Sequence, residues 1–311
     1  MQFFSETKID FISKRTIAFI ISGTIILIGI ISLIINNGPK YSIDFLGGTL
    51  LELDFTPVDA NAESIKIQDI RDVLNKYGYL GAEIQEFGNP NYILVRIKGS
   101  KIVGKQVIDI LQKEFPKYTK KNMNEFLRRQ EEVGPRIGEE LRGKAIKAIL
   151  IAMLGIIIYI WWRFELSFGI AAVIALFHDV FITIGIFSIF GREISLPVIA
   201  ALLTIVGYSL NDTIVVFDRI REDLKIYRRD KFKSVINHSI NETLSRTVIT
   251  SLTTFVVVLS LFLFGGSVIH NFALALLIGI IVGTYSSIFV ASPVLVEYYE
   301  RSGKKSTLIK R

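Results

Sequence analysis

The residues of this sequence best suited to chemistry are charged side chains inside stretches that are otherwise uncharged. Asp179, preceded by His178, and Asp212 each stand alone in a long apolar run, and Arg246 opens another. A charge near the centre of a membrane costs about 2.5–3.5 kcal/mol or more on insertion scales. We therefore expect these side chains to face the interior of a helical bundle, a charged partner or water.

Polar residues at helical spacing accompany these charges. They are Thr183 beside Asp179, Thr204 and Tyr208 beside Asp212, and Thr250, Thr253 and Thr254 beside Arg246. Desolvation drives a buried carboxylate towards its neutral form and a nearby cation drives it back, so such a group can take up and release a proton. An arginine stays charged. The sequence thus predicts an interior polar track in which Arg246 switches Asp212 by approaching and withdrawing.

Other interpretations of these charges stay open. Asp212 and Arg246 can form a static ion pair between two spans, and His178 can be a hydrogen-bonded structural histidine. Asp179 and Asp212 could share one proton, as in an intramembrane aspartyl protease. However, Ser-Leu-Asn precedes Asp212 in place of the Gly-x-Gly expected in that class. The chain lacks cysteine and shows no nucleophile–base pair or metal-ligand spacing, so we expect no enzyme activity, cofactor or metal.

Apolar runs supply the elements that must hold these residues. They cover residues 16–39, 148–162, 166–191, 194–217, 247–269 and 271–296. Crossing about 30 Å of hydrocarbon takes about 20 helical residues. Only 148–162 is shorter, and Lys144 and Lys147 before it can extend to the interface. The predicted fold class is a polytopic α-helical membrane protein with six transmembrane helices.

The distribution of charge predicts the topology. We expect an N-terminal tail at 1–15, a first span at 16–37, an inserted domain at 38–143, spans two to six within 144–296 with a basic loop at 218–246, and a tail at 297–311. The segments on the side of the termini hold 17 Lys and Arg, whereas Arg192 is the only cation in the short loop opposite. Short cytoplasmic loops are rich in Lys and Arg. Both termini are therefore expected in the cytoplasm, the inserted domain outside, and the first span retained, since it is too long for a cleaved signal.

The inserted segment has the pattern of an α+β domain. Apolar and charged residues alternate in 49–55 and 93–97, which is the period of a strand, and 83–87 and 126–133 are further candidate strands. Helical spacing links Ile70, Val73, Leu74 and Tyr77, and again Val103, Val107, Ile110 and Leu111. The order strand, helix, strand, strand, helix, strand is that of a ferredoxin-like fold. No catalytic constellation stands out, so we interpret it as a binding or lever module.

Two further patterns concern packing and lipids. Small residues recur every fourth position at Gly279, Gly283, Ser287 and Ala291, which favours close approach of a neighbouring helix. The loop 218–246 mixes basic and apolar residues and is typical of an amphipathic helix on the anionic lipids of the inner leaflet. Positive charge on the cytoplasmic side explains the basic excess, so nucleic-acid binding is not expected.

An ordered set of short motifs resembles one known family. The motifs are DFLGGT at 44–49, VGP at 133–135, HD at 178–179, SLNDT at 209–213, FDRIRE at 217–222, NETLSRT at 241–247, FGG at 264–266 and GTYSS at 283–287. Together they resemble the SecD/SecF family of Sec translocase subunits, within the resistance–nodulation–division (RND) superfamily. The resemblance covers nearly the whole chain.

The resemblance implies a function that the spans alone do not. A chain of this kind would pair with SecD beside the SecYEG channel and use the proton-motive force to promote export of preproteins. Its proton pathway would fall on Asp212 and Arg246, with Asp179, His178, Asn211 and Thr250 as accessory polar residues. Two alternatives remain: a half-size RND exporter of lipids or small molecules, and a scaffold without proton coupling.

Overall fold

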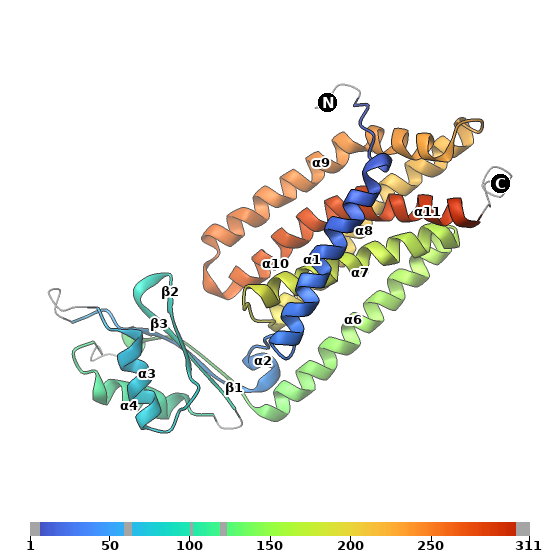
Figure 1. Cartoon of the computed structure of the whole chain (residues 1–311). Coiled ribbons are helices and arrows are strands. Elements are labelled where there is room, and N and C mark those ends of the chain that lie inside the picture. The colour runs from blue at the N-terminus through green and yellow to red at the C-terminus, as the bar shows by residue number, and fades with distance from the viewer. Residues whose placement is uncertain (1–6, 59–63, 100–101, 119–122, 303–311) are drawn as a thin grey trace. The chain divides into compact units, whose positions relative to one another are not determined.

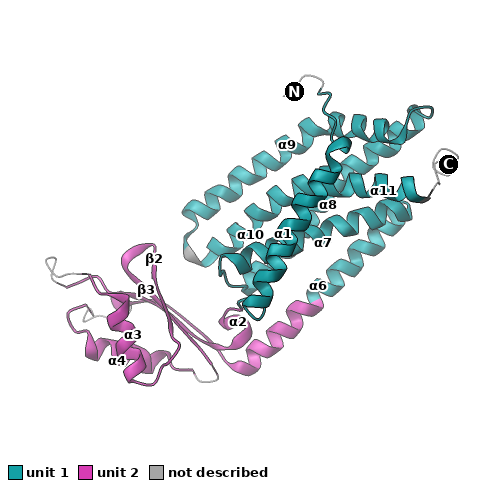
Figure 2. Ribbon diagram, viewed as in Figure 1, with its two compact units in different colours: residues 1–40, 148–311 teal, residues 41–147 magenta. Residues whose placement is uncertain are grey.

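The chain divides into two compact units, which are described separately. The computed structural model describes residues 7–58, 64–99, 102–118 and 123–302. One unit comprises residues 1–40 and 148–311, and the other comprises residues 41–147 (Figure 2).

The first unit is a bundle of long apolar helices. Within the described residues, six helical spans are long and apolar enough to cross a membrane. They are α1 (Arg15–Ile35), α6 (Pro135–Arg163), α7 (Leu166–Ile189), α8 (Leu196–Ile226), α9 (Phe232–Phe264) and a last span built from α10 (Gly266–Ser286), the π-helical turn η2 (Ser287–Ala291) and α11 (Ser292–Ser302) (Figure 1). A 3-10 turn, η1 (Ile12–Lys14), precedes α1. The predicted six-span fold is confirmed.

Two boundaries differ from the sequence expectation. Helix α6 begins at Pro135, ahead of residue 144, because proline suits the first position of a helix and Glu140 pairs with Lys144 at 2.7 Å. The loop expected at 218–246 is mostly helical, because α8 continues to Ile226 and α9 already starts at Phe232. The apolar side chains of residues 218–246 pack in the bundle core. The prediction of an amphipathic helix lying on the inner leaflet is therefore wrong.

Helices α7, α8 and α10 form the buried centre of the bundle, whereas α1 and α9 expose most of their apolar side chains. The predicted small-residue face of the last span packs on α8. A Cβ added to Gly279 would stand 2.2 Å from Cγ1 of Ile205, and one added to Gly283 would stand 3.0 Å from Cβ of Ser209. The packing interpretation is therefore confirmed.

Helices α1 and α7 also meet through glycine. A Cβ added to Gly29 would stand 2.9 Å from the Cα of Gly185, which is backbone and cannot move aside. We expect Gly29→Ala to lower the stability of the purified chain by about 1–3 kcal/mol, as overpacking does. Thermal unfolding in detergent measures this loss. Gly23→Ala on the same helix meets nothing within 4 Å and serves as the control; equal losses would contradict the packing argument.

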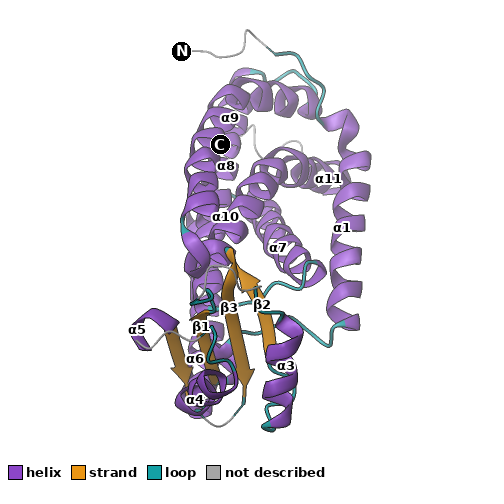
Figure 3. Cartoon of the chain, turned by 90° about the vertical axis from the view of Figure 1, so that its left-hand side faces the viewer, coloured by secondary structure: helices purple, strands orange, loops and turns teal. Residues whose placement is uncertain are grey.

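The second unit is a small α+β domain. Its elements are α2 (Ile43–Leu46), β1 (Gly48–Asp54), α3 (Ile67–Lys76), β2 (Glu83–Phe87), β3 (Asn89–Lys98), α4 (Gly104–Glu114), α5 (Met123–Phe126) and β4 (Leu127–Val133). The strands, orange in Figure 3, form one antiparallel sheet in the order β2-β3-β1-β4. With α3 after β1 and α4 after β3, this is the predicted ferredoxin-like arrangement.

The core of this domain lies on one face of the sheet. Leu51, Leu53 and Phe55 alternate inward from β1 and its end, and they pack with residues of α3 and α4, including Ile70 and Val107. The opposite face is mixed: Glu52 pairs with Arg128 at 3.1 Å, while Leu50 and Leu94 pack with Ile43 of α2 in a smaller apolar cluster. The alternation that predicted strands in the sequence thus separates the main core face from a face that is partly charged.

Candidate functional site

Asp179 is the centre of a hydrogen-bond network inside the bundle. The hydroxyl of Ser209 on α8 donates to Oδ2 of Asp179 at 2.5 Å, and that of Ser286 on α10 donates to the same oxygen at 2.8 Å. The second carboxylate oxygen, Oδ1, lies 2.8 Å from Nδ1 of His178. Asp179 is fully buried, so these groups replace the water that a carboxylate otherwise binds.

The packing of α10 on α8 brings the two serines to Asp179. Gly283 gives Ser209 the room to approach, since a Cβ at this glycine would stand 3.2 Å from the Ser209 hydroxyl oxygen. Ser286 is the last residue of α10, and the π-helical turn η2 follows directly. Such turns occur mostly as single insertions at functional sites. The network therefore depends on the backbone of the last span.

A second branch of the network runs from His178 to α1. The Nε2 atom of His178 lies 3.0 Å from the hydroxyl oxygen of Ser22. That hydroxyl oxygen lies 3.1 Å from the phenol oxygen of Tyr285. Tyr285 donates in turn to the carbonyl oxygen of Ala18 at 3.0 Å. These contacts are those of the predicted structural alternative for His178, a histidine with both ring nitrogens hydrogen-bonded.

Asp212 occupies a different buried position. It is 3% exposed and accepts a hydrogen bond from Ser251 of α9 at 3.2 Å through Oδ2. Ser251 in turn accepts from Thr284 of α10 at 2.7 Å. Asp212 and Asp179 accept hydrogen bonds from different hydroxyls. Two carboxylates that share a proton must be hydrogen-bonded to each other, and among the described residues no hydrogen bond joins these two. The geometry does not favour the protease alternative.

Arg246 lies within electrostatic range of Asp212 but does not contact it. Its side chain is exposed, and among the described residues it forms no ion pair with Asp212. Thr250 uses its hydroxyl to cap the carbonyl of Arg246 at 2.8 Å, and Thr204 and Asn211 are exposed. The static Asp212–Arg246 ion pair is therefore not formed among the described residues, whereas Tyr208 of the expected track donates to the carbonyl oxygen of Thr250 at 3.3 Å. The roles of Asp212 and Arg246 in proton movement stay predictions.

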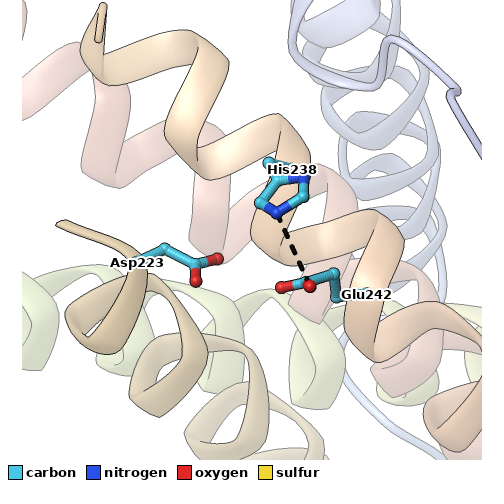
Figure 4. A group of neighbouring side chains, drawn as sticks. All are labelled: Asp223, His238 and Glu242. Carbon is cyan, nitrogen blue, oxygen red and sulfur yellow. Dashed lines mark ion pairs between the residues drawn. The ribbon is translucent and has the colours of Figure 1, made fainter. Parts of the chain in front are cut away.

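A cluster of charges joins the end of α8 to the start of α9. Arg219 contacts Glu242 at 2.5 Å and Asp223 at 3.2 Å. Figure 4 shows Asp223, His238 and Glu242, with His238 3.5 Å from Glu242. One ligand atom each from Asp223, His238 and Glu242 lies within 4.8 Å of the others, a spacing open to a metal ion. Arg219 already supplies the positive charge between these carboxylates, so we interpret the cluster as a network of ion pairs that joins α8 to α9.

Two asparagines of α9 hold the segment before α1. The side-chain oxygen of Asn241 accepts from the backbone nitrogen of Ile9 at 2.9 Å, and its amide donates to the carbonyl of Ile9 at 2.8 Å. Asn237, one turn earlier, accepts from the nitrogen of Phe11 at 2.9 Å. The same segment is thus tied to the helix that carries Arg246.

Sequence reasoning missed the hydroxyl partners of both aspartates. Ser209, Ser286 and Thr284 stand in the quoted motifs but carry no charge, so nothing marked them as facing a carboxylate. Ser251 had no signal except its position one turn after Thr247 on the same face of α9. Which serine meets which aspartate depends on packing between helices far apart in sequence.

These observations define a class of protein. It is an integral membrane protein whose six-helix bundle buries two aspartates among hydroxyl groups and carries an inserted ferredoxin-like domain. Comparison with known proteins gives the family. A model described as "Protein export membrane protein SecD/SecF, C-terminal" matches residues 112–301, and one for the "SecD/SecF GG Motif" matches residues 32–57. The chain belongs to the SecD/SecF family.

Its relatives agree with this assignment. The protein translocase subunit SecF of Desulfurispirillum indicum is 48% identical, with 94% of this chain and 92% of the relative covered. That of Calditerrivibrio nitroreducens is 46% identical, with 93% of each covered.

Solved structures agree as well. The crystal structure of SecDF, described as a translocon-associated membrane protein, from Thermus thermophilus matches 95% of this chain with a TM-score of 0.83 and 37% identity. A SecDF structure in a super-membrane-facing form matches 97% of it with a TM-score of 0.69 and 38% identity. The chain spans 39% and 40% of those two longer chains.

Proposed function

We propose that this chain is an accessory subunit of the Sec translocase which, together with SecD, uses the proton-motive force to promote export of preproteins through SecYEG. The names of its relatives support the translocase role. The observation that carries the proton-driven part is Asp212, a buried carboxylate inside a membrane span that accepts a hydrogen bond from the neutral hydroxyl of Ser251. Such a carboxylate can hold or release a proton without breaking an ion pair.

The surroundings of Asp212 support a path that rearranges. The hydroxyl of Thr247, one turn from Ser251 on α9, is buried and has no hydrogen-bond partner among the described residues. A buried polar atom without a partner marks a place where water enters or where a second arrangement supplies the missing bond. Arg246, the residue directly before Thr247 on α9, then provides the positive charge that favours the ionised form of Asp212 whenever it approaches.

In this proposal both termini lie in the cytoplasm and the ferredoxin-like domain lies outside the cell membrane. The excess of Lys and Arg in 218–246 and in the terminal segments supports this orientation. The domain would convert the protonation cycle into movement against the emerging preprotein. In sequence, α1 leads into the domain and α6 leads out of it.

A polar surface on α8 and α9 supports SecD as the partner. We define the α8–α9 polar stripe as Thr204, Asn211, Arg246 and Thr253, which are exposed side chains on two spans in contact with each other. Exposed polar and charged groups are costly next to lipid tails and serve as attachment points between helices. A second membrane subunit covering the stripe would remove this cost.

Cysteine cross-linking tests the partner. The chain has no cysteine, so Asn211→Cys and Thr253→Cys each introduce a unique thiol. In membranes containing SecD, we expect both variants to cross-link to SecD, while Ile20→Cys, an apolar site 63% exposed on α1, does not. Cross-linked products are identified by gel shift and mass spectrometry. Cross-links only between copies of this chain would instead support the homodimeric exporter.

A further inference from the structure

The His178–Asp179 pair is a buried titratable group that the proposed path through Asp212 does not use. His178 is 6% exposed and Asp179 is fully buried. Oδ2 of the aspartate is already bonded by Ser209 and Ser286, so Oδ1 is the oxygen left for the imidazole. An ionised carboxylate accepts hydrogen bonds only, which makes Nδ1 of His178 the donor. The nitrogen that can gain or lose a proton is therefore Nε2.

The hydroxyls beyond Nε2 suit both protonation states. When Nε2 carries a proton, it donates to Ser22, whose hydroxyl donates to Tyr285, which donates to the carbonyl of Ala18. When Nε2 is bare, the Ser22 hydroxyl turns and donates to it, and Tyr285 can donate to Ser22. Hydroxyl hydrogens rotate freely to suit their partners. The chain thus reverses direction without any heavy atom leaving hydrogen-bond distance.

Among the described residues, the surroundings of the pair are hydroxyl groups and an aromatic ring. Its polar contacts are Ser22 from α1, Ser209 from α8, and Ser286 from α10, and Tyr285 of α10 also stacks on the imidazole with ring centroids 6.1 Å apart. Among the described residues, no lysine or arginine forms an ion pair with Asp179. A buried carboxylate without a cation is costly. A second proton on His178 supplies the missing positive charge.

We propose that His178 and Asp179 form a second proton-binding site of the bundle, in which the proton is held at His178 Nε2 against the Ser22 hydroxyl, with Tyr285 beyond it. Asp179 holds the imidazole and stabilises its charged form, and it is a positioning residue in this role. The pair touches α1, α8 and α10, and Ser209 lies three residues before Asp212 on α8. Loading this site therefore changes the hydrogen bonds between α1 and α10 beside the helix that carries Asp212.

Nitrogen-15 NMR of the histidine rings tests this site directly. The chain has three histidines, and the loss of one set of ring resonances in His178→Gln identifies those of His178. When the pH of the full chain in lipid nanodiscs is scanned from about 5 to about 8, we expect the spectra of His178 to contain a doubly protonated form beside the form protonated at Nδ1 alone. A single neutral form across that range would overturn the proposal.

Matched hydroxyl variants separate a proton site from a structural tie. Ser22→Ala and Tyr285→Phe remove the hydroxyls beyond Nε2, and we expect each to move the midpoint of the conversion between the two forms. Ser188→Ala breaks the 2.8 Å bond to Ser32, which also joins α7 to α1 but does not touch His178. It should leave the midpoint in place; an equal shift there would contradict the hydroxyl chain. Asp212→Asn should retain the titration, so this test is independent of the proposed function.

Discussion

Replacing Asp212 with asparagine is expected to abolish proton-driven stimulation of preprotein export while leaving the chain folded and assembled. Asparagine has the same shape, and its carbonyl oxygen can still accept the hydrogen bond from Ser251. It cannot take up or release a proton. In vesicles that contain SecYEG and SecD, we expect export with a proton-motive force to be no faster than export without it.

Two variants control this result. Asp212→Glu keeps a titratable carboxyl and should retain part of the stimulation. Asp223→Asn removes another fully buried carboxylate from the same helix, one that contacts Arg219 at 3.2 Å and accepts from Ser239 at 2.6 Å. It should lower stability but leave the stimulation of the folded protein intact. Normal stimulation in Asp212→Asn would remove Asp212 from the proton pathway.

The spans and the ferredoxin-like order followed from the sequence because their signals are local. Apolar runs and two-residue alternation report the environment of each residue directly, as in Leu51, Leu53 and Phe55 of β1 and its end. Helix ends were less predictable. Helix α6 begins at Pro135, well before the apolar run that starts at residue 148. Its charged first turns were not predicted, because charged residues outside a membrane can continue a helix without an apolar pattern.

Thr204 and Asp212 were expected on one face of their helix, and they show that helical spacing is a poor guide over eight residues. Eight residues of an α-helix turn by about 800°, which leaves the two side chains about 80° apart. Thr204 is exposed and Asp212 is buried, in agreement with this drift. Arg246 is likewise exposed. This could not be predicted, because a single sequence does not tell which side of α9 meets α8. The interhelical partners of both aspartates depend on that same information.

The paired glycines of the DFLGGT motif predict a large effect in the other unit. Gly48 opens β1 with a φ of 136°, and a Cβ there would stand 2.3 Å from the carbonyl oxygen of Ile97. That oxygen belongs to β3, which pairs with β1 at this position. Gly48→Ala therefore combines a backbone strain of about 1–3 kcal/mol with a collision that must separate two central strands. We expect a loss of about 4 kcal/mol or more.

Hydrogen exchange on the full chain measures this loss where it occurs. Amides of β1 and β3 should lose protection in Gly48→Ala, while those of α7 in the other unit keep theirs. Gly99→Ala is the matched control, because Gly99 has a φ of 146° but nothing within 4 Å of an added Cβ. It carries the strain without the collision. Because the two glycines have similar φ angles, any excess loss at Gly48 comes from contact with Ile97. Equal losses would mean that β1 and β3 can adjust around a side chain. The motif would then not be needed for their pairing.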